Sequence, residues 1–303
     1  DLGNTPGNDM RFYTKRVEAN RNFANKLWNA TRFLMMNMSD EIEDSNFDVD
    51  KLHYQDKWII SKLQKVIKSI TEKIDKYEIG LAADDIYDFI WSDFCDWYIE
   101  IVKPVLYSDD VEEKTNTVKV LLYVLENILK LLHPFMPYIT EEIWQALPNR
   151  KEALILASWP EYNEDLVFEK EEKATEYIEN AIREIRNARS EMNIENSKKS
   201  NTLVYTKDEE VREIFEEMKG LLLNLGYSNS VEITDDEGKK DSENIAIVLD
   251  KAEIQLPLKE LVDFEKELKR LQKDKKEAED ELKRAKGKLA NEGFVSKAQI
   301  GRA

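Results

Sequence analysis

The sequence has little cysteine, histidine, glycine and proline, and each scarcity excludes a class of structure. Cys95 is the only cysteine, and His53 and His133 are the only histidines among 303 residues. A disulfide within the chain and a zinc site built from Cys and His ligands are therefore excluded. We expect Cys95, in the run WSDFCDWY, to be a buried apolar side chain, and we expect a reducing, cytoplasmic compartment. With nine glycines and seven prolines, loops should be short and the fold mainly α.

The sequence also lacks a long apolar run and an excess of basic residues. No apolar run approaches the roughly 18 residues of a membrane-spanning helix. The first residues, DLGNTPGNDM, lack the basic and apolar regions of a signal peptide, so we expect no membrane partner. The net charge is −17, which disfavours nucleic-acid binding by the chain as a whole, because phosphate contacts need Lys and Arg. Any such binding must depend on local clusters of basic residues.

Residues 1–160 are predicted to form an antiparallel helix bundle. Apolar residues recur at helical spacing, and short breaks separate the helices. Pro104 is expected to end the third helix because proline has no backbone N–H, and Thr140 is expected to cap the fifth. The expected helices span 14–38, 49–77, 82–102, 110–132 and 139–147.

Residues 161–257 are predicted to form a small α+β domain that connects the bundle to the rest of the chain. The preceding run LILASWP, at 154–160, is expected to be extended and to mark the boundary. The sequence DDEG at 235–238 is expected to form a hairpin turn between two strands. The expected elements are helices over 166–191 and 208–219 and strands over 202–206, 231–234 and 244–250.

Residues 258–303 are predicted to form a coiled-coil arm that this chain does not complete. Apolar residues follow a heptad repeat over about four heptads, with charged residues at most other positions. One helix cannot bury such a seam, and only ten residues follow Gly293, too few to return along it. The chain alone is therefore expected to be truncated and to self-associate artificially. The seam consists of Leu261, Phe264, Leu268, Leu271, Lys275, Ala278, Leu282, Ala285 and Leu289.

The helix over 14–38 carries two stripes of side chains. The first is apolar and is expected to face the core: Phe23, Leu27, Ala30 and Leu34. The second lies about 100° away on a helical wheel and consists of Asn22, Lys26, Asn29 and Phe33. Single-stranded RNA loops are bound by this mixture, because aromatic rings stack on bases, amides read base edges and cations hold phosphates. The alternative is that Phe33 makes a second core contact.

Two further basic clusters could contact RNA. The first, expected on a helix over 182–199, has the candidate residues Arg183, Arg186 and Arg189, followed by Lys198 and Lys199. The second lies near the tip of the arm: Lys283, Arg284, Lys286 and Lys288. The alternative for both clusters is a solvated face with acidic neighbours. Arg21, Trp28 and Arg32 form another face of the helix over 14–38. This face could contact the RNA backbone or pack against another domain.

Three groups of motifs occur in a recognisable order along the chain. They are GNDMRF (7–12) with RNFANKLWNATRF (21–33), YDFIWSDFCDWYIE (87–100) with LLHPFMPYITEEIWQ (131–145), and LPLKELVDFEKELKRLQKD (256–274) with KLANEGFVSKA (288–298). Together they resemble valyl-tRNA synthetases over essentially the whole chain. The first two groups are typical of the valyl, isoleucyl and leucyl subgroup. The third separates valyl from isoleucyl synthetases, which often end in a cysteine zinc module.

The resemblance implies a class I anticodon-binding bundle followed by a connector and a tRNA-binding arm. The implied partner is valine tRNA, with Lys15, Lys26 and Phe33 at positions that meet the anticodon in the family. In the family, the arm leans on the outer corner of the tRNA. The HIGH and KMSKS signatures are absent, so this chain is expected to have no catalytic residue, metal ligand or cofactor of its own. The parent enzyme would attach valine with ATP and Mg²⁺ in a catalytic domain that is missing here.

Two alternatives remain at this level. The chain could be a homo-oligomeric helical scaffold that pairs through the heptads over 261–289. It could also be the corresponding region of an isoleucyl or leucyl enzyme, although the heptads and the absence of terminal cysteines weigh against this. The tail QIGRA does not continue as the returning helix of the family.

Overall fold

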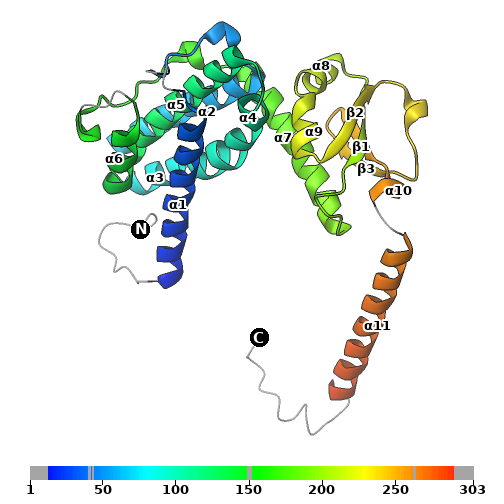
Figure 1. The fold of residues 1–303 in the computed structure, drawn as a ribbon. Coiled ribbons are helices and arrows are strands. Elements are labelled where there is room, and N and C mark those ends of the chain that lie inside the picture. Colours follow the sequence, from blue (N-terminus) through cyan, green and yellow to red (C-terminus); the bar gives the residue numbers. More distant parts are fainter. Residues whose placement is uncertain (1–12, 40–41, 43, 149–151, 262–263, 290–303) are drawn as a thin grey trace. The chain divides into compact units, whose positions relative to one another are not determined.

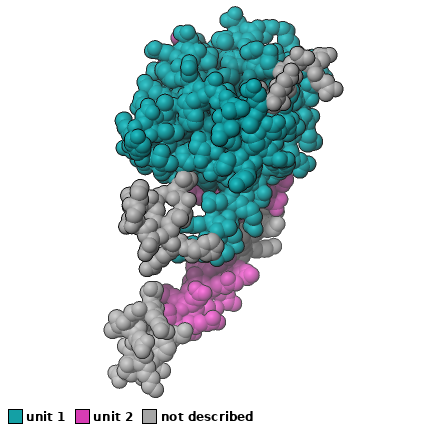
Figure 2. Space-filling view, turned by 90° about the vertical axis from the view of Figure 1, so that its left-hand side faces the viewer, with its two compact units in different colours: residues 1–183, 213–225 teal, residues 184–212, 226–303 magenta. Residues whose placement is uncertain are grey.

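The computed structural model divides the chain into two compact units (Figure 2). Unit 1 comprises residues 1–183 and 213–225, and unit 2 comprises residues 184–212 and 226–303. The expected three-part division at residues 160 and 257 stays a prediction. The structure describes residues 13–39, 42, 44–148, 152–261 and 264–289, and within the last range the side chains of residues 268 and 272–287.

Unit 1 is a helix bundle, and the predicted, mainly α fold is confirmed (Figure 1). Its longest helices come from segments in which apolar residues recur at helical spacing. The helices are α1 (Thr14–Asn37), α2 (Tyr54–Asp75), α3 (Ile79–Asp88), η2 (Phe89–Tyr98), α4 (Ile99–Leu106), α5 (Val111–Leu132) and α6 (Pro137–Ala146), with short 3₁₀ turns η1 (Val49–Lys51), η3 (Leu154–Leu156) and η4 (Glu164–Leu166).

Helix α5 lies at the centre of this bundle. It packs against α1, α2, α3, α4 and α6, and its apolar side chains from Val118 to Leu132 are buried. Asp110 caps its start, because the carboxylate accepts a hydrogen bond from the backbone N–H of Glu113. A helix that is buried on several sides holds the others in place, so the bundle has one continuous core.

The predicted third helix differs from the structure in its winding and its end. Residues Phe89–Tyr98 form the π-helix η2, and the chain continues through Pro104 as α4 to Leu106. The prediction that Pro104 ends the helix was therefore wrong. Only two helical residues follow this proline, so the lost hydrogen bond falls in the last turn, where it perturbs least.

Two smaller predictions in the bundle were also wrong. Thr140 lies inside α6 and does not cap it, because its hydroxyl donates back to the carbonyls of Met136 and Pro137. Pro137 occupies the first turn instead, a position where the missing N–H costs little. Residues 154–156 form a 3₁₀ turn and are not extended.

The helices after the bundle are α7 (Glu169–Glu191), α8 (Glu209–Glu217) and α9 (Lys219–Leu225). Two of them, α7 and α8, lie within the predicted ranges 166–191 and 208–219, whereas α9 was not predicted. Helix α7 stops at Glu191, and Asn193 then adopts a left-handed conformation with φ 52°. Lys198 and Lys199 therefore lie in the segment before the first strand. The prediction of a helix that reaches residue 199 was wrong.

Unit 2 contains a four-stranded mixed sheet with the order β2-β1-β4-β3. Strand β1 pairs in parallel with β2 and antiparallel with β4, and β4 pairs antiparallel with β3. The predicted hairpin across residues 235–238 was wrong, because β2 and β3 lie at opposite edges. The hairpin joins β3 to β4 through Lys251, whose φ of 64° makes the tight turn. The strands are β1 (Ser200–Tyr205), β2 (Ser228–Thr234), β3 (Ile245–Leu249) and β4 (Ala252–Leu256), with a 3₁₀ turn η5 (Glu237–Lys239).

The predicted arm is helical in the part that the structure describes. A short helix, α10 (Leu258–Leu261), precedes α11 (Phe264–Leu289). The heptad pattern predicted Leu261 as the first residue of the exposed seam. This was wrong, because Leu261 is buried in α10. The break expected at 291–293 lies outside the described residues.

Candidate nucleic-acid interface

Helix α1 presents the two stripes that the sequence pattern separates. The apolar stripe is buried in the bundle, as predicted: Phe23, Leu27, Ala30 and Leu34. On the second stripe, Asn22 and Asn29 are exposed and Phe33 is half-buried. Lys15 is exposed on the same face, about two turns before Phe23, the first buried residue of the helix. Amide groups of the stripe are therefore open to a ligand, whereas its aromatic ring is partly packed.

Lys26 is held between two residues of the π-helix η2. Its ammonium lies 2.6 Å from a carboxylate oxygen of Asp96 and 3.7 Å from the centroid of the Trp91 ring. Trp91 and Asp96 are five residues apart, which is the hydrogen-bond step of a π-helix. In an α-helix they would point about 140° apart, so the π winding is what brings both to Lys26. The cation is therefore fixed in direction and already partly neutralised.

A row of stacked aromatic rings supports this cation. Phe23 stacks on Tyr87 at a centroid distance of 4.7 Å, and Tyr87 lies nearly parallel to Trp91 at 5.9 Å. The row leads from the buried core to the half-buried Trp91. Because the rings are fixed by packing, Trp91 and the Lys26 ammonium above it have little freedom to move.

Phe33 has a cationic neighbour on α4. The ammonium of Lys103 lies 5.8 Å from the centroid of the Phe33 ring and 2.5 Å from a carboxylate oxygen of Glu100. The stripe of α1 thus contacts η2 through Lys26 and α4 through Phe33, and a cation lies over each of the rings of Trp91 and Phe33. Trp91, Asp96 and Lys103 were not predicted from the sequence as residues of this site. The run WSDFCDWY is visibly rich in aromatic residues, but which of its side chains face α1 depends on the π winding of η2.

The remaining face of α1 is open to solvent. Arg21, Trp28 and Arg32 are all exposed, and Arg21 donates a long hydrogen bond of 3.5 Å to the side-chain oxygen of Asn22. Residues 13–22 contain no buried side chain. The first two and a half turns of the helix are therefore accessible on all sides within the described part of unit 1.

The basic cluster on α7 is divided by the structure. Arg183 is exposed, with its guanidinium 5.7 Å from the centroid of Trp97, the second half-exposed tryptophan of η2. Arg186 lies 5.7 Å from the ring of Tyr227. Arg189 is only 1% exposed, and its Nη2 donates to the backbone carbonyls of Glu195 and Lys198. Arg189 is thus committed to the protein, whereas Arg183 is accessible.

The arm presents its basic residues without restriction. Lys283, Arg284 and Lys286 are exposed on α11, and the side chain of Lys288 lies outside the described residues. Every side chain of α11 that the structure describes is exposed. The exposed cations of the arm can therefore bind a polyanion, but their arrangement does not favour one polyanion over another.

Two carboxylates with little exposure are Glu179 of α7, which is buried, and Asp93 of η2, which is half-buried. Burial raises the pKa of Glu179 to about 8, with a further contribution from the charge of Asp93. Burial also raises the pKa of Asp93 to about 6, against the opposing effect of Lys62. Burial likewise raises the pKa of Cys95 to about 12, which fits the expected buried thiol. No group of three His, Cys, Asp or Glu side chains in the described residues could hold a metal ion.

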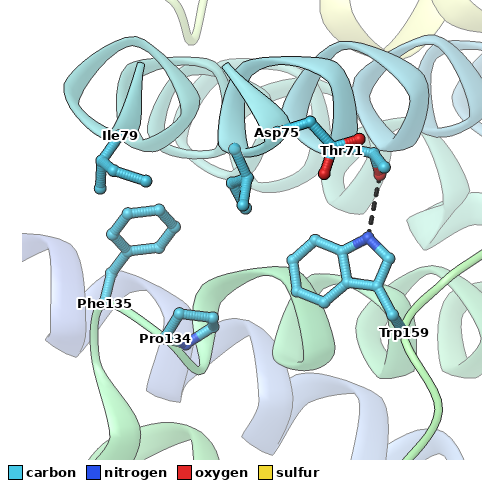
Figure 3. A pocket seen from close by; sticks show the side chains of 7 residues that line it. Thr71, Asp75, Ile79, Pro134, Phe135 and Trp159 are labelled. Atoms are coloured by element: carbon cyan, nitrogen blue, oxygen red, sulfur yellow. Dashed lines mark hydrogen bonds between the residues drawn. The ribbon is translucent and has the colours of Figure 1, made fainter. Parts of the chain in front are cut away.

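A cavity of about 370 Å³ opens between α2, α3 and the segment after α5 (Figure 3). Trp159 donates from its indole nitrogen to the hydroxyl of Thr71 at 2.9 Å, and Phe135 faces Ile79 across the opening. Asp75 is the only titratable side chain in the lining, so the cavity holds no pair of nucleophile and base. Among the residues that the structure describes, none of the helices combines the length and the apolar character that a membrane span requires.

Two family models match separate parts of the chain. The model described as the anticodon-binding domain of tRNA ligase matches residues 56–205, which include η2, Trp97 and Arg183. The model described as the valyl tRNA synthetase tRNA binding arm matches residues 263–299, which include α11. Helix α1 lies before both matches.

Curated relatives match nearly the whole chain. Valine–tRNA ligases of Clostridium perfringens, Clostridium acetobutylicum and Staphylococcus carnosus are 46%, 43% and 40% identical to it over 98% of its length. The chain spans 34% of the length of each of these relatives. A solved structure, the ternary complex of Agrobacterium radiobacter K84 agnB2 LeuRS-tRNA-LeuAMS, matches 52% of the chain and 18% of its own chain at 18% identity, with a TM-score of 0.36.

Proposed function

We propose that this chain, whose residues 56–205 match the model of the anticodon-binding domain of tRNA ligase, is the tRNA-binding region of a valine–tRNA ligase. The observation that carries the proposal is the match of an anticodon-binding model and a tRNA-binding arm model in this order. The identity of 46% to a valine–tRNA ligase over 98% of the chain supports valine as the amino acid. An isoleucyl or leucyl enzyme is correspondingly disfavoured.

In this proposal, the second stripe of α1 contacts the anticodon. Exposed amides at Asn22 and Asn29 can donate to and accept from base edges, and the half-buried ring of Phe33 can stack on a base that leaves the loop. Lys15, which is exposed before the bundle begins, is free to meet a phosphate. The mixture suits a single-stranded loop better than a duplex, whose bases are already stacked.

Lys26 acts in this site as a directed hydrogen-bond donor. Asp96 already offsets its charge, and Trp91 covers one side of the ammonium. A neutralised cation gains little from a phosphate, but its remaining N–H bonds keep a fixed direction toward a base edge. This assignment favours recognition by Lys26 over general electrostatic attraction.

Backbone contacts come from the exposed cations outside the stripe. We assign them to Arg183 and, on the arm, to Lys283, Arg284 and Lys286, with Lys288 retained from the sequence alone. Arg186, which lies against Tyr227, is a weaker candidate. We leave Arg189 out because its guanidinium is buried and serves two backbone carbonyls.

The complete ligase would act in the cytoplasm and would use ATP and Mg²⁺ to attach valine in its catalytic part. The contribution of this chain would be binding energy from the anticodon and the outer corner of the tRNA. Such remote contacts raise the rate when they hold the reacting end in place at the catalytic centre.

Filter binding with two transfer RNAs tests the proposal. The chain should retain valine tRNA at lower protein concentration than isoleucine tRNA at the same salt. Equal retention of both, or no retention of either, would contradict the proposed function. Val111→Ala, at a strongly exposed position of α5 outside the stripe and the basic clusters, is the control and should bind like the unmodified chain.

The exposed seam of the arm supports a second candidate, a scaffold that pairs through α11. Leu268 and Leu282 are 58% and 55% exposed, and both belong to the heptad repeat. Sedimentation of the chain and of Leu282→Lys distinguishes the two. A dimer that this substitution abolishes favours the scaffold, whereas a monomer at all concentrations excludes it.

A further inference from the structure

The short helix α10 is bound to strand β1 of the sheet by two hydrogen bonds between Glu260 and Asn201. One oxygen of Glu260 accepts the backbone N–H of Asn201, and the other accepts the side-chain amide, each at 3.0 Å. Pairing of β1 with β4 begins only at Leu203, so this carboxylate takes the place of a strand partner at the start of β1. Ser230 of β2 donates to the side-chain oxygen of Asn201 at 2.8 Å, which fixes the amide for Glu260.

Three other contacts hold the same helix. Leu261 is 1% exposed and anchors α10 in the core of unit 2. Its backbone carbonyl accepts a hydrogen bond of 3.4 Å from the ammonium of Lys198, a favourable partner at a helix C-terminus. Lys259 forms an ion pair with Glu243, in the segment before β3. The helix is thus held by an apolar side chain, a capped carbonyl and two charged contacts.

Arg189 organises the segment from which Lys198 reaches the helix. Its Nη2 donates to the carbonyls of Glu195 and Lys198, and Tyr227 lies over its guanidinium at 5.3 Å. A buried guanidinium that bridges two carbonyls fixes the backbone around them. This gives a role to the basic residue that the sequence pattern assigned to RNA.

From these contacts we infer that Glu260 and Asn201 are positioning residues. They hold α10 (Leu258–Leu261), which we call the root of the arm, on the sheet, so that α11 starts from a fixed point. The inference rests on the proposed role of the arm in tRNA binding. A root that is fixed before binding lowers the entropy that the arm loses when it meets the tRNA.

Spin labels on the complete chain measure the arm directly. One label goes on Val248→Cys, exposed at the edge of the sheet, and the other on Glu281→Cys, exposed on α11. The native Cys95 is buried and its pKa is raised to about 12, so it reacts poorly with the label. In the otherwise unmodified chain, the distribution of distances between the labels should be narrow.

Glu260→Ala should broaden this distribution, and Glu277→Ala should not. The control removes the same charge from α11, where Glu277 has only a 3.7 Å contact with Lys273. Asn201→Asp is the second variant, because its carboxylate repels Glu260 while the size of the side chain is kept. A distribution that is already broad in the unmodified chain, or that stays narrow in both variants while circular dichroism shows the fold intact, overturns the inference.

Binding of valine tRNA separates this inference from the proposed function. Glu260→Ala should weaken binding by about two- to tenfold, the cost of ordering a few side chains at an interface. Unchanged affinity despite a broadened distribution overturns the positioning role. Failure of the unmodified chain to bind valine tRNA refutes the proposed function, and in that case the label distances still decide whether Glu260 fixes the root.

Discussion

Helices α1 and α11 have similar lengths, 24 and 26 residues, and both carry an apolar stripe, but they are stabilised in different ways. The stripe of α1 is buried in the bundle, whereas Leu268 and Leu282 of α11 are more than half exposed. Helix α11 depends on its own propensity and on weak pairs such as Lys273–Glu277 and Lys275–Glu279, at 3.7 and 3.9 Å. The same sequence pattern therefore describes a core element in one case and an unfilled seam in the other.

The difference also separates two ways of contacting RNA. Beside α1, contacts with Asp96 and Trp91 fix the direction in which the Lys26 ammonium points. On α11, Lys283, Arg284 and Lys286 are exposed, and affinity there should depend on charge and salt. Selectivity is expected from the first region and general attraction from the second.

The largest expected effect follows from the burial of the α1 stripe. Leu27→Ala should lower the free energy of unfolding by about 2–5 kcal/mol, because it opens a cavity at a fully buried position. Leu282→Ala removes the same atoms from α11 and should change it by less than about 0.5 kcal/mol. Urea unfolding followed by tryptophan fluorescence measures both. Equal effects would mean that the seam of α11 is covered.

A pair of glutamates gives the next comparison. Burial raises the pKa of Glu179 from 4.5 to about 8, so the folded chain keeps a proton that the unfolded chain releases within this range. Stability from this group is complete below pH 4.5 and is lost as the pH rises to about 8. Glu179→Gln should therefore reduce the fall in unfolding free energy over this range by about 1–3 kcal/mol.

Glu279→Gln is the matched control, because Glu279 is exposed on α11. It should leave the pH dependence of unfolding unchanged. Urea titrations at several pH values between 5 and 8 measure the slope, within the range that Glu179 defines. A slope that is the same in the Glu179 variant and the unmodified chain would show that this carboxyl is ionised in the folded state.

Phe33→Ala tests the stacking role of the stripe. Binding of a valine anticodon stem-loop should weaken by about 1–3 kcal/mol, the usual value of a base stacked on an aromatic ring. Phe33 is only half-buried, so the melting temperature should change little. If the variant loses stability and binds as well as the unmodified chain, Phe33 is a core residue.

Salt dependence gives the smallest effect and separates Lys15 from Lys26. Lys15→Ala should reduce the slope of log affinity against log salt by about 0.7, the value for one phosphate contact on a single strand. Lys26→Ala should weaken binding without changing the slope, because Asp96 already neutralises this cation. A reduced slope for Lys26→Ala would mean that Lys26 leaves Asp96 for a phosphate.

Local patterns in the sequence predicted most helices but not the pairing of strands. Helices α1, α5 and α7 follow from apolar periodicity, and Asp110 marks the start of α5 as an N-cap does. The sheet order could not be read in this way, since β2 and β3 are neighbours in sequence but pair with β1 and β4. The true hairpin turns at Lys251, a residue that rarely signals a left-handed turn.

The candidate site was predictable as a stripe but not as an arrangement of contacts. Helical geometry alone places Asn22, Asn29 and Phe33 on one face of α1. The partners of Lys26 depend on the π winding of η2, and the burial of Arg189 depends on a segment that folds back over it. Neither is set by local spacing, because both arise when separate segments pack together.

Chemical footprinting of valine tRNA tests the central claim, that α1 contacts the anticodon, most directly. With the unmodified chain, the nucleotides of the anticodon loop and those of the outer corner should both be protected. Phe33→Ala should expose the anticodon loop alone, and Glu260→Ala should affect only the outer corner. An anticodon loop that reacts equally with and without the chain, while other parts of the tRNA are protected, would contradict the claim.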